Sequence, residues 1–289
     1  MARSRVTIRD VAAEAGVSHQ TVSRVINGSE RVHPDTRQRV QTAISLLGDR
    51  PNAIARSMAK GRTGTLACLT PNLTDYTFAS IIEGAQKAAR EHGFFLMSAA
   101  APNEETFGAF VEQLVGGRRT EGLIVVNPYQ DGRFSLLPPD IPVVFAGARP
   151  REEDATSSVA LDDVAVARRE TEHLLQKVHR RLAMVCGLPN EDCTQDRTAG
   201  FASALQAAGL LLNNMSVESG DWTAVSGYKA MMRLFGRGTL PTAVFAQNDQ
   251  MAVGVLKAAA ELGLTVPDDL SVISIDDIPL ASYFSPSLT

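Results

Sequence analysis

Hydrophobic residues recur every three or four positions in the first fifty residues, which is the spacing of amphipathic helices. In residues 7–15, TIRDVAAEA, the apolar positions fall on one helical face. Thr7 followed by Asp10 has the form of a capping box, and Gly16 is suited to end the helix. Ser18 can cap a second helix, HQTVSRVIN, and a third, PDTRQRVQTAISLLG, starts with proline and ends with glycine. These three helices predict an all-α helix-turn-helix head over residues 1–48.

The second helix has two unlike faces. At about 100° per residue, Val22 and Val25 lie on one arc, and His19, Gln20 and Arg24 lie on the opposite arc. Gln can bind adenine bidentately and Arg can bind guanine, so this polar arc suits the major groove of DNA. Three further polar residues are suited to phosphate or additional base contacts, namely Ser18, Thr21 and Asn27. The alternative is a surface helix with a solvated polar face.

Residues 49–61 follow as a predicted hinge helix and linker. Pro51 prevents an ordinary continuation of the preceding helix, and the segment NAIARSMA is short enough to be marginal as an isolated helix. Met58 could insert into a minor-groove step. The alternative is a plain linker helix that buries Ile54 and Met58 locally.

From residue 62 onward, short apolar runs alternate with amphipathic segments. Strands are expected at 64–70, 94–100, 122–126, 142–148, 182–187, near 215–221, at 243–246 and at 271–276. Helices are expected at 77–93, 103–117, 163–178, 196–209, 223–236 and 248–263. This order predicts parallel sheets with helices on both faces. Ligands of such folds bind beyond the carboxyl ends of the strands, where the sequence has Asn127, Gly147, Asn248, Asp276 and Asp277.

The charge of the chain changes at about residue 62, where the pattern of hydrophobic residues also changes. Residues 1–62 hold eleven Lys and Arg and five Asp and Glu, a net charge of +6, whereas the other residues hold 17 basic and 27 acidic residues, a net charge of −10. A basic head on an acidic body indicates that the head alone meets a polyanion. The chain has three cysteines, a small and odd number that argues against a disulfide framework. It favours a protein of the reducing cytoplasm. No apolar run is long enough for a membrane span, and the first residues lack the apolar core of a secretory signal.

Little in the sequence indicates catalysis. The phosphate-loop, metalloprotease, serine-hydrolase and paired-cysteine motifs are all absent, and the five histidines have no metal-ligand spacing. The neighbours Asp276 and Asp277 would point in opposite directions at a strand end, so a shared proton is not expected. We therefore expect no cofactor, no metal and no enzymatic activity.

Residues 6–27, VTIRDVAAEAGVSHQTVSRVIN, resemble the DNA-binding signature of the LacI-type bacterial transcription regulators. RPNAIARSMA resembles the hinge helix of that family. DRTAGF, GDWTAVSGYKAM, PTAVFAQNDQMAVGVLKA and SVISIDD are similar to stretches of its effector domain and stand in the same order. The resemblance implies a homodimeric, cytoplasmic repressor of sugar-utilisation genes that binds a palindromic operator. A sugar or sugar-derivative effector would relieve repression from a cleft between two lobes resembling a periplasmic binding protein.

The same resemblance assigns residues by position. His19, Gln20 and Arg24 would read bases, and Thr7, Ser18, Thr21, Ser23, Asn27 and Thr36 would contact or support contacts to phosphates. Asn52, Ala55 and Met58 would lie on the hinge. In the cleft, Arg197, Trp222, Asn248 and Asp276 would hold the effector, since Arg and Asp bind vicinal hydroxyls and an indole stacks on a sugar ring. Asn127, which follows an expected strand, is expected to join them.

Each cleft residue also has a structural alternative. Trp222 could be a core residue, Arg197 and Asp276 could pair only with each other, and Asn248 could cap the helix that follows it. Gly147 stands where one member of the family has an acid, and the nearby Arg149 leaves room for an acidic or phosphorylated sugar.

The expected lobes are residues 62–160, which the family pattern suggests are incomplete, and residues 161–289. The chain ends at YFSPSLT, where that pattern continues, so we expect exposed apolar surface on the first lobe and lowered stability. A sugar-binding transport component and a sugar-modifying α/β enzyme are the rival interpretations. The transport component leaves the head unexplained, and the enzyme lacks a recognisable acid, base or nucleophile.

Overall fold

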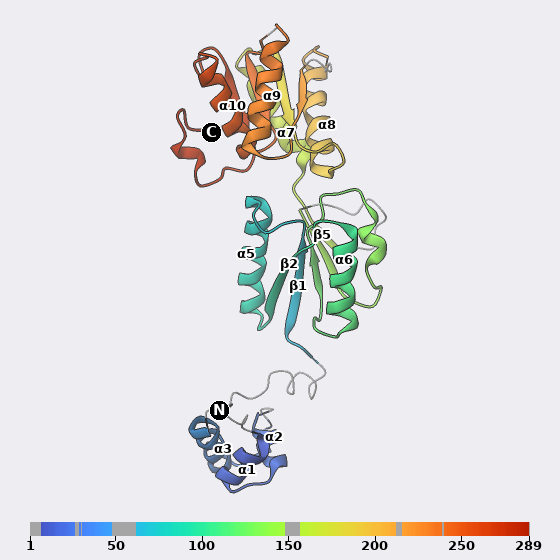
Figure 1. Cartoon of the computed structure of the whole chain (residues 1–289), viewed down its shortest axis with the longest axis vertical. Coiled ribbons are helices and arrows are strands. Elements are labelled where there is room, and N and C mark those ends of the chain that lie inside the picture. Colours follow the sequence, from blue (N-terminus) through green and yellow to red (C-terminus); the bar gives the residue numbers. More distant parts are fainter. Residues whose placement is uncertain are drawn as a thin grey trace, which may run out of the picture.

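The structure is a computed structural model of the chain. It describes residues 7–26, 29, 31–47, 62–147, 157–211, 216–238 and 240–288. Three parts follow one another along the chain: a helical head, lobe 1 with its parallel sheet, and lobe 2 with a second parallel sheet (Figure 1). Across these ranges, none of the helices combines the length and the hydropathy needed to span a bilayer.

The head contains α1 (Ile8–Ala15), α2 (His19–Ile26) and α3 (Pro34–Leu47). Thr7 caps α1 in the predicted capping box: its hydroxyl accepts from the Asp10 N–H, and the Asp10 carboxylate accepts from the Thr7 N–H at 2.8 Å. Gly16 ends α1 with a φ of 61°, which is why glycine suits this position. The small core of the head contains Val11, Ala12, Ala15, Val22, Val25, Val32, Val40 and Ala43.

Lobe 1 is a five-stranded sheet in the order β2-β1-β3-β4-β5, and each pairing is parallel. Its strands are β1 (Thr65–Thr70), β2 (Phe95–Ala100), β3 (Leu123–Val125), β4 (Val143–Ala146) and β5 (Ser157–Val159). Its helices are α5 (Tyr76–Glu91) and α6 (Glu104–Val111), the π-helical turn Glu112–Gly116 and the 3-10 turn Gly132–Leu136. Successive side chains of β1 point to opposite faces, so Cys68 packs with α5 while Ala67 and Leu69 pack with α6.

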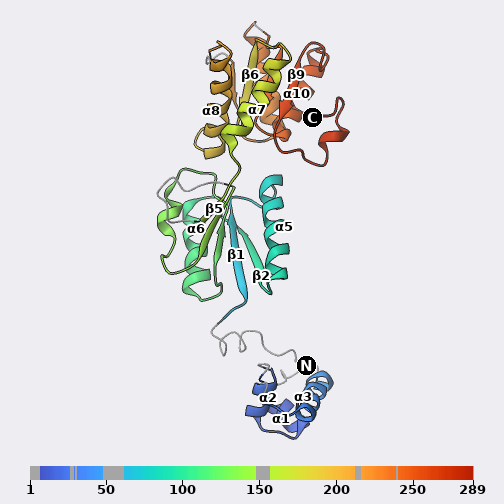
Figure 2. The same cartoon turned by 180° about the vertical axis from the view of Figure 1, so that it is seen from behind.

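Lobe 2 is a four-stranded parallel sheet in the order β7-β6-β8-β9. Its strands are β6 (Leu182–Cys186), β7 (Val217–Ser219), β8 (Ala243–Ala246) and β9 (Ser271–Ser274). Helices α7 (Asp163–Gln176) and α8 (Asp192–Ala207) cover one face, and α9 (Ala224–Gly236) and α10 (Asp249–Glu261) cover the other (Figure 2). A 3-10 turn, Ala281–Tyr283, follows β9.

The two lobes meet at the carboxyl ends of their strands. The loop after β3 and the loop after β6 form an antiparallel bridge between Tyr129 and Glu191. In each sheet the strand order reverses at the first strand, between β1 and β3 in lobe 1 and between β6 and β8 in lobe 2. Such reversal points are where open α/β sheets bind ligands. The fold therefore brings two edges of this kind face to face.

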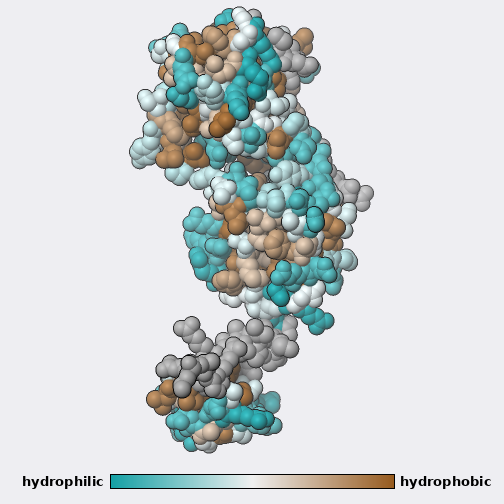
Figure 3. All heavy atoms as spheres, in the orientation of Figure 1, coloured by the Kyte–Doolittle hydropathy of each residue, from teal (hydrophilic) through white to brown (hydrophobic). Residues whose placement is uncertain are grey.

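Lobe 1 also leaves large hydrophobic side chains in contact with solvent. Phe95 on β2 and Val159 on β5 are 67% and 71% exposed, and Val144 on β4 is exposed as well. Figure 3 shows hydrophobic residues gathered in the middle of this lobe, with hydrophilic residues on either side.

Three of the differences from the sequence prediction concern α8, β5 and α6. Helix α8 begins at Asp192, four residues before the predicted start, because Glu191 at its N-cap directs its carboxylate elsewhere and gives no capping signal. Strand β5 was not predicted, since its three residues are exposed and lack alternation. The helix expected over 103–117 changes to π-helical geometry at Glu112.

Candidate nucleic-acid interface and interlobe cleft

Helix α2 presents its polar arc to solvent. His19, Gln20 and Arg24 are exposed, whereas Val22 and Val25 are buried in the head core. The apolar arc thus fixes the helix on its own domain, and the polar arc is free to meet another molecule. This is the division that a recognition helix in a major groove requires.

The start of α2 is held by a local hydrogen-bond network. The Ser18 hydroxyl accepts from the Thr21 N–H at 3.1 Å and shares a hydrogen bond of 2.9 Å with the Thr21 hydroxyl. Thr7 stands at the N-cap of α1, and Ser23 and Thr36 are half-buried. The other predicted DNA-contacting residues, Asn27, Asn52, Ala55 and Met58, lie outside the described residues.

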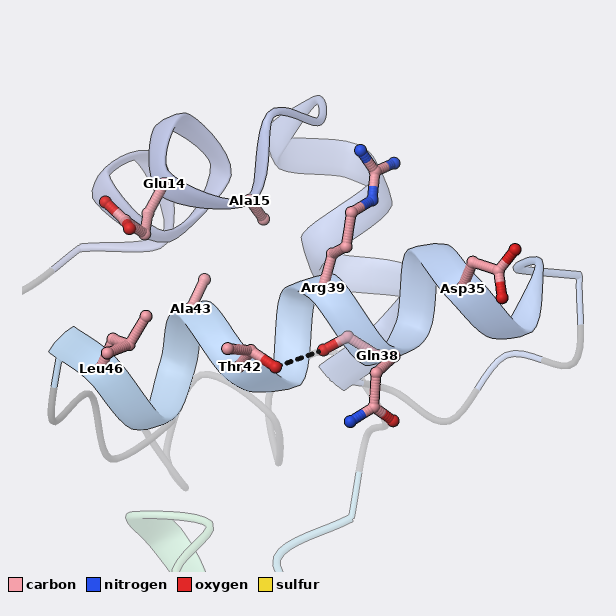
Figure 4. Close-up of a pocket in the computed structure, with 8 residues that line it drawn as sticks. All are labelled: Glu14, Ala15, Asp35, Gln38, Arg39, Thr42, Ala43 and Leu46. Carbon is pink, nitrogen blue, oxygen red and sulfur yellow. Dashed lines mark hydrogen bonds between the residues drawn. The ribbon is translucent and has the colours of Figure 1, made fainter.

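The head also has a hollow between α1 and α3 (Figure 4). It is lined by Glu14, Ala15, Asp35, Gln38, Arg39, Thr42, Ala43 and Leu46. None of these residues belongs to α2. The hollow is therefore separate from the exposed polar arc.

The facing strand ends of the two lobes, together with the loops that follow them, form the region that we call the cleft. In this region Trp222 is held by three neighbouring groups. Its indole N–H donates to the Glu191 carboxylate at 2.5 Å, and its carbonyl accepts from the Asn248 amide at 3.1 Å. The ring lies directly against Gly187, where an added Cβ would stand 2.0 Å from Cζ2. The backbone of Trp222 has a φ of 70°, a conformation that favours glycine. Contacts on several sides therefore fix the indole in an unusual conformation.

Arg197 is 8% exposed and already has an anionic partner. Its Nε donates to Asp163 at 2.7 Å, and its Nη1 donates to the Gln247 carbonyl. Its guanidinium carbon lies 5.9 Å from the centroid of the Trp222 ring. The ion pair of Arg197 is therefore with Asp163 rather than with Asp276, the partner considered in the sequence analysis.

The two predicted asparagines make local hydrogen bonds. Asn248 caps α10, since its side-chain oxygen accepts from the Met251 N–H at 2.9 Å. Asn127 donates to the Tyr129 carbonyl at 3.1 Å and accepts from Arg133 at 2.6 Å. Each side-chain amide therefore fixes a loop beside the cleft. For Asn248 these contacts are those of the structural alternative, in which it caps the helix that follows it.

Among the residues that the structure describes around Trp222, carboxyl groups outnumber the positively charged groups that have no anionic partner. Burial raises the pKa of Glu191 to about 7, and burial likewise raises the pKa of Asp276 to about 7. Asp75, which caps α5 in lobe 1, is a negative neighbour that acts in the same direction on both groups. The described part of the cleft is thus acidic, and its buried arginine, Arg197, is neutralised by Asp163.

Sequence reasoning did not identify Glu191, Asp163, Gln247 or Asp75 as members of this site. The side chain of Gln247 is fully buried and joins the loop after β6 to α8, accepting from Gly187 at 3.0 Å and donating to Thr198 at 3.2 Å. Gln247 follows β8 directly, so the rule for strand ends could have found it. Nothing in the local sequence pairs Glu191 with Trp222 or Asp163 with Arg197.

Comparisons with known proteins support both parts of this arrangement. Residues 7–52 match the bacterial regulatory proteins of the lacI family, and residues 171–289 match a periplasmic binding protein-like domain. The transcriptional repressor PurR of Erwinia tasmaniensis is 35% identical over 286 residues, which cover 98% of this chain and 84% of PurR. The chain belongs to the lacI family of bacterial regulatory proteins.

Other similar proteins are also transcription regulators. The regulator GalS of Salmonella typhimurium is 35% identical, over 98% of the chain and 84% of GalS. The lac repressor dimer bound to operator and the anti-inducer ONPF superposes with a TM-score of 0.90 at 30% identity, over 99% of this chain and 87% of that one. The complex of the regulator CelR with cellobiose gives a TM-score of 0.73 at 32% identity, over 98% and 86%.

These relatives decide between the interpretations of the sequence. The predicted family and the fold, a helix-turn-helix head followed by two α/β lobes, are confirmed. The chain is a DNA-binding transcription regulator, and the interpretations as a transport component or a sugar-modifying enzyme do not apply.

Proposed function

We propose that α2 reads operator DNA through His19, Gln20 and Arg24. The observation that supports this proposal is that α2 exposes its polar arc while its apolar arc is buried in the head. Thr7, Ser18, Thr21, Ser23, Asn27 and Thr36 contact phosphates or support the residues that do. Asn52, Ala55 and Met58 of the hinge, residues 49–61, enter the minor groove.

The functional unit that we propose is a cytoplasmic homodimer on a palindromic operator. Two heads, each formed by residues 1–48, then read two half-sites related by the two-fold axis. The structural match to a lac repressor dimer bound to operator supports this arrangement.

The test of DNA reading is selection of bound duplexes from a randomised library, with the chain as it stands and at moderate salt. We expect a palindrome. Arg24→Ala is expected to cost about 1–3 kcal/mol and to relax the choice at one base pair. Arg90→Ala, at an exposed position of α5, is the matched control. Equal weakening on all sequences would instead make Arg24 a phosphate contact, and binding without sequence preference would refute the proposal.

In the cleft between residues 62–160 and 161–289, we propose a sugar effector that weakens operator binding. Asn127, Arg197, Trp222, Asn248 and Asp276 line the site. Trp222 supplies a stacking surface for a sugar ring, and Asp276 supplies acceptors for its hydroxyls. Because Arg197 is neutralised by Asp163 while Glu191 and Asp276 are both carboxyls, the cleft favours a neutral sugar over an acidic or phosphorylated one. Arg149, which motivated the anionic alternative, lies outside the described residues.

Trp222 is the one tryptophan of the chain, so its emission reports directly on the cleft. We expect a neutral mono- or disaccharide from a panel to change this emission and to release the selected duplex. The phosphorylated forms of the same sugars are the controls. A response to the phosphorylated forms alone would contradict the neutral class, and release of DNA without a change in emission would place the effector elsewhere.

A further inference from the structure

Two loops connect the lobes through a hydrogen-bonded contact, which we call the interlobe clasp. It consists of residues 128–130 of lobe 1 and, in lobe 2, of residues 190–192 together with Gln195. Two of its hydrogen bonds are made by the backbone: Gln130 N–H donates to the Asn190 carbonyl at 3.3 Å, and Asp192 N–H donates to the Pro128 carbonyl at 2.9 Å. The clasp is distinct from the crossover of the chain between lobes at residues 160–162.

The side chain of Gln130 adds two more hydrogen bonds. Its Nε2 donates to Asp192 Oδ1 at 2.8 Å and to Gln195 Oε1 at 2.9 Å, so both amide hydrogens of a lobe 1 residue bind lobe 2. Gln195 in turn donates to the Pro189 carbonyl at 3.0 Å. About half of the hydrogen bonds of the clasp therefore depend on one exposed side chain.

Glu191 belongs to the clasp and to the cleft at once. Its backbone forms the bridge with Tyr129, and its carboxylate accepts from the indole N–H of Trp222. The residue is 3% exposed, and although it stands at the N-cap of α8, its side chain does not cap that helix. The carboxylate is thus committed to the indole rather than to the helix that follows it.

We propose that Glu191 is the positioning residue that couples a ligand at Trp222 to the interlobe clasp, and through it to operator binding. A ligand that stacks on the indole changes the position of the hydrogen-bonded pair, and the backbone of Glu191 carries that change to residues 128–130. Because a ligand shifts an equilibrium only through unequal affinity for two states, the clasp must differ between the operator-bound and the free protein. This inference rests on the proposed reading of operator DNA.

Emission of Trp222 provides a test without an identified effector. By reciprocity, if cleft and DNA are coupled, operator DNA must alter the cleft. The full chain is mixed with the selected duplex, or with a scrambled duplex of the same length and composition. The selected duplex is expected to change the emission, and the scrambled duplex is expected to change it much less.

Variants locate the coupling. Gln130→Ala removes two of the four hydrogen bonds of the clasp and is expected to reduce the operator-induced change in emission by about half. Glu191→Ala removes the acceptor of the indole and is expected to abolish the change, whereas Glu191→Gln, which keeps an acceptor oxygen, is expected to restore most of it. Gln206→Ala, at an exposed position near the other end of α8, is the control and should behave as the unmodified chain.

Each contrary outcome has a separate meaning. Selective DNA binding with an unchanged emission overturns the coupling and leaves the proposed function standing. An unreduced change in Gln130→Ala overturns the role of the clasp, and because Gln130 is exposed, this variant is not expected to unfold the protein. The absence of any selected duplex overturns both the coupling and the reading of operator DNA.

Discussion

Replacing Glu191 by glutamine is expected to remove a pH-dependent loss of stability from lobe 2. Burial raises the pKa of this carboxyl from its ordinary 4.5 to about 7, so the folded protein holds the proton more tightly than the unfolded chain. The stabilising contribution of the proton is complete below about pH 4.5 and is lost as the pH rises through about 7. At higher pH the ionised, buried carboxylate lowers the stability by roughly 3 kcal/mol.

Several groups besides the indole of Trp222 face Glu191. They are Asp75 from α5, Tyr129 from the loop after β3, and Cys193 and Arg197 from α8. Asp75 acts with burial to favour the protonated form, and Arg197 acts against it. Asp276 has a pKa raised in the same direction, so part of the pH dependence is expected to persist in Glu191→Gln.

The assay is denaturant unfolding at about pH 5 and about pH 8, followed by the emission of Trp222. The unmodified chain is expected to lose stability between the two values, and Glu191→Gln is expected to lose roughly 3 kcal/mol less. Glutamine preserves an acceptor for the indole N–H, so the comparison isolates the charge. Asp268→Asn, at an exposed position of lobe 2, is the control. Equal pH dependence in the variant and the unmodified chain would refute the assignment of the raised pKa to Glu191.

Two further substitutions address the packing of the cleft. Gly187→Ala places a Cβ 2.0 Å from the indole of Trp222. It is expected to lower the free energy of unfolding by about 1–3 kcal/mol and to shift the emission of Trp222. An unshifted spectrum would contradict the close approach of the ring to Gly187. Arg197→Met leaves Asp163 as a buried charge without its partner and is expected to cost about 3–5 kcal/mol in denaturant unfolding. Adding Asp163→Asn to that variant should recover part of the loss, and no recovery would show that the ion pair is not the cause.

The alternation of strands and helices could be predicted because it depends on local periodicity. The predicted strand AVFA has the same bounds as β8. The Thr7 capping box begins α1 and Gly16 ends it, as expected. Both signals lie within a few residues of the element that they specify. The predicted start of α8 was wrong because its N-cap residue, Glu191, accepts a hydrogen bond from the distant Trp222 instead of capping the helix.

The cleft could be predicted only in part, for the same physical reason. Polar residues after β8 and β9 were identified because ligands bind at strand ends. The partners of those residues are set by packing: Glu191 and Trp222 are 31 positions apart, and Asp163 and Arg197 are 34 positions apart. No local pattern encodes such pairs, so the acidity of the cleft becomes visible only in the fold.

Backbone strain gives an independent argument that the cleft is a functional site. Of five described non-glycine residues with positive φ, three lie in the loops after β7 and β9, namely Trp222, Asp276 and Asp277. Conformations of this kind cost about 1–3 kcal/mol each and persist where the surrounding contacts hold them. A glycine at position 222 would avoid the cost, yet the chain keeps an indole there, fixed by Glu191, Asn248 and Gly187. The half-buried indole also packs against the hydrophobic core of lobe 2, so the core alternative describes part of its contacts. The position of the strain is therefore what favours a ligand site, because Trp222, Asp276 and Asp277 all follow strand ends where open α/β sheets bind ligands.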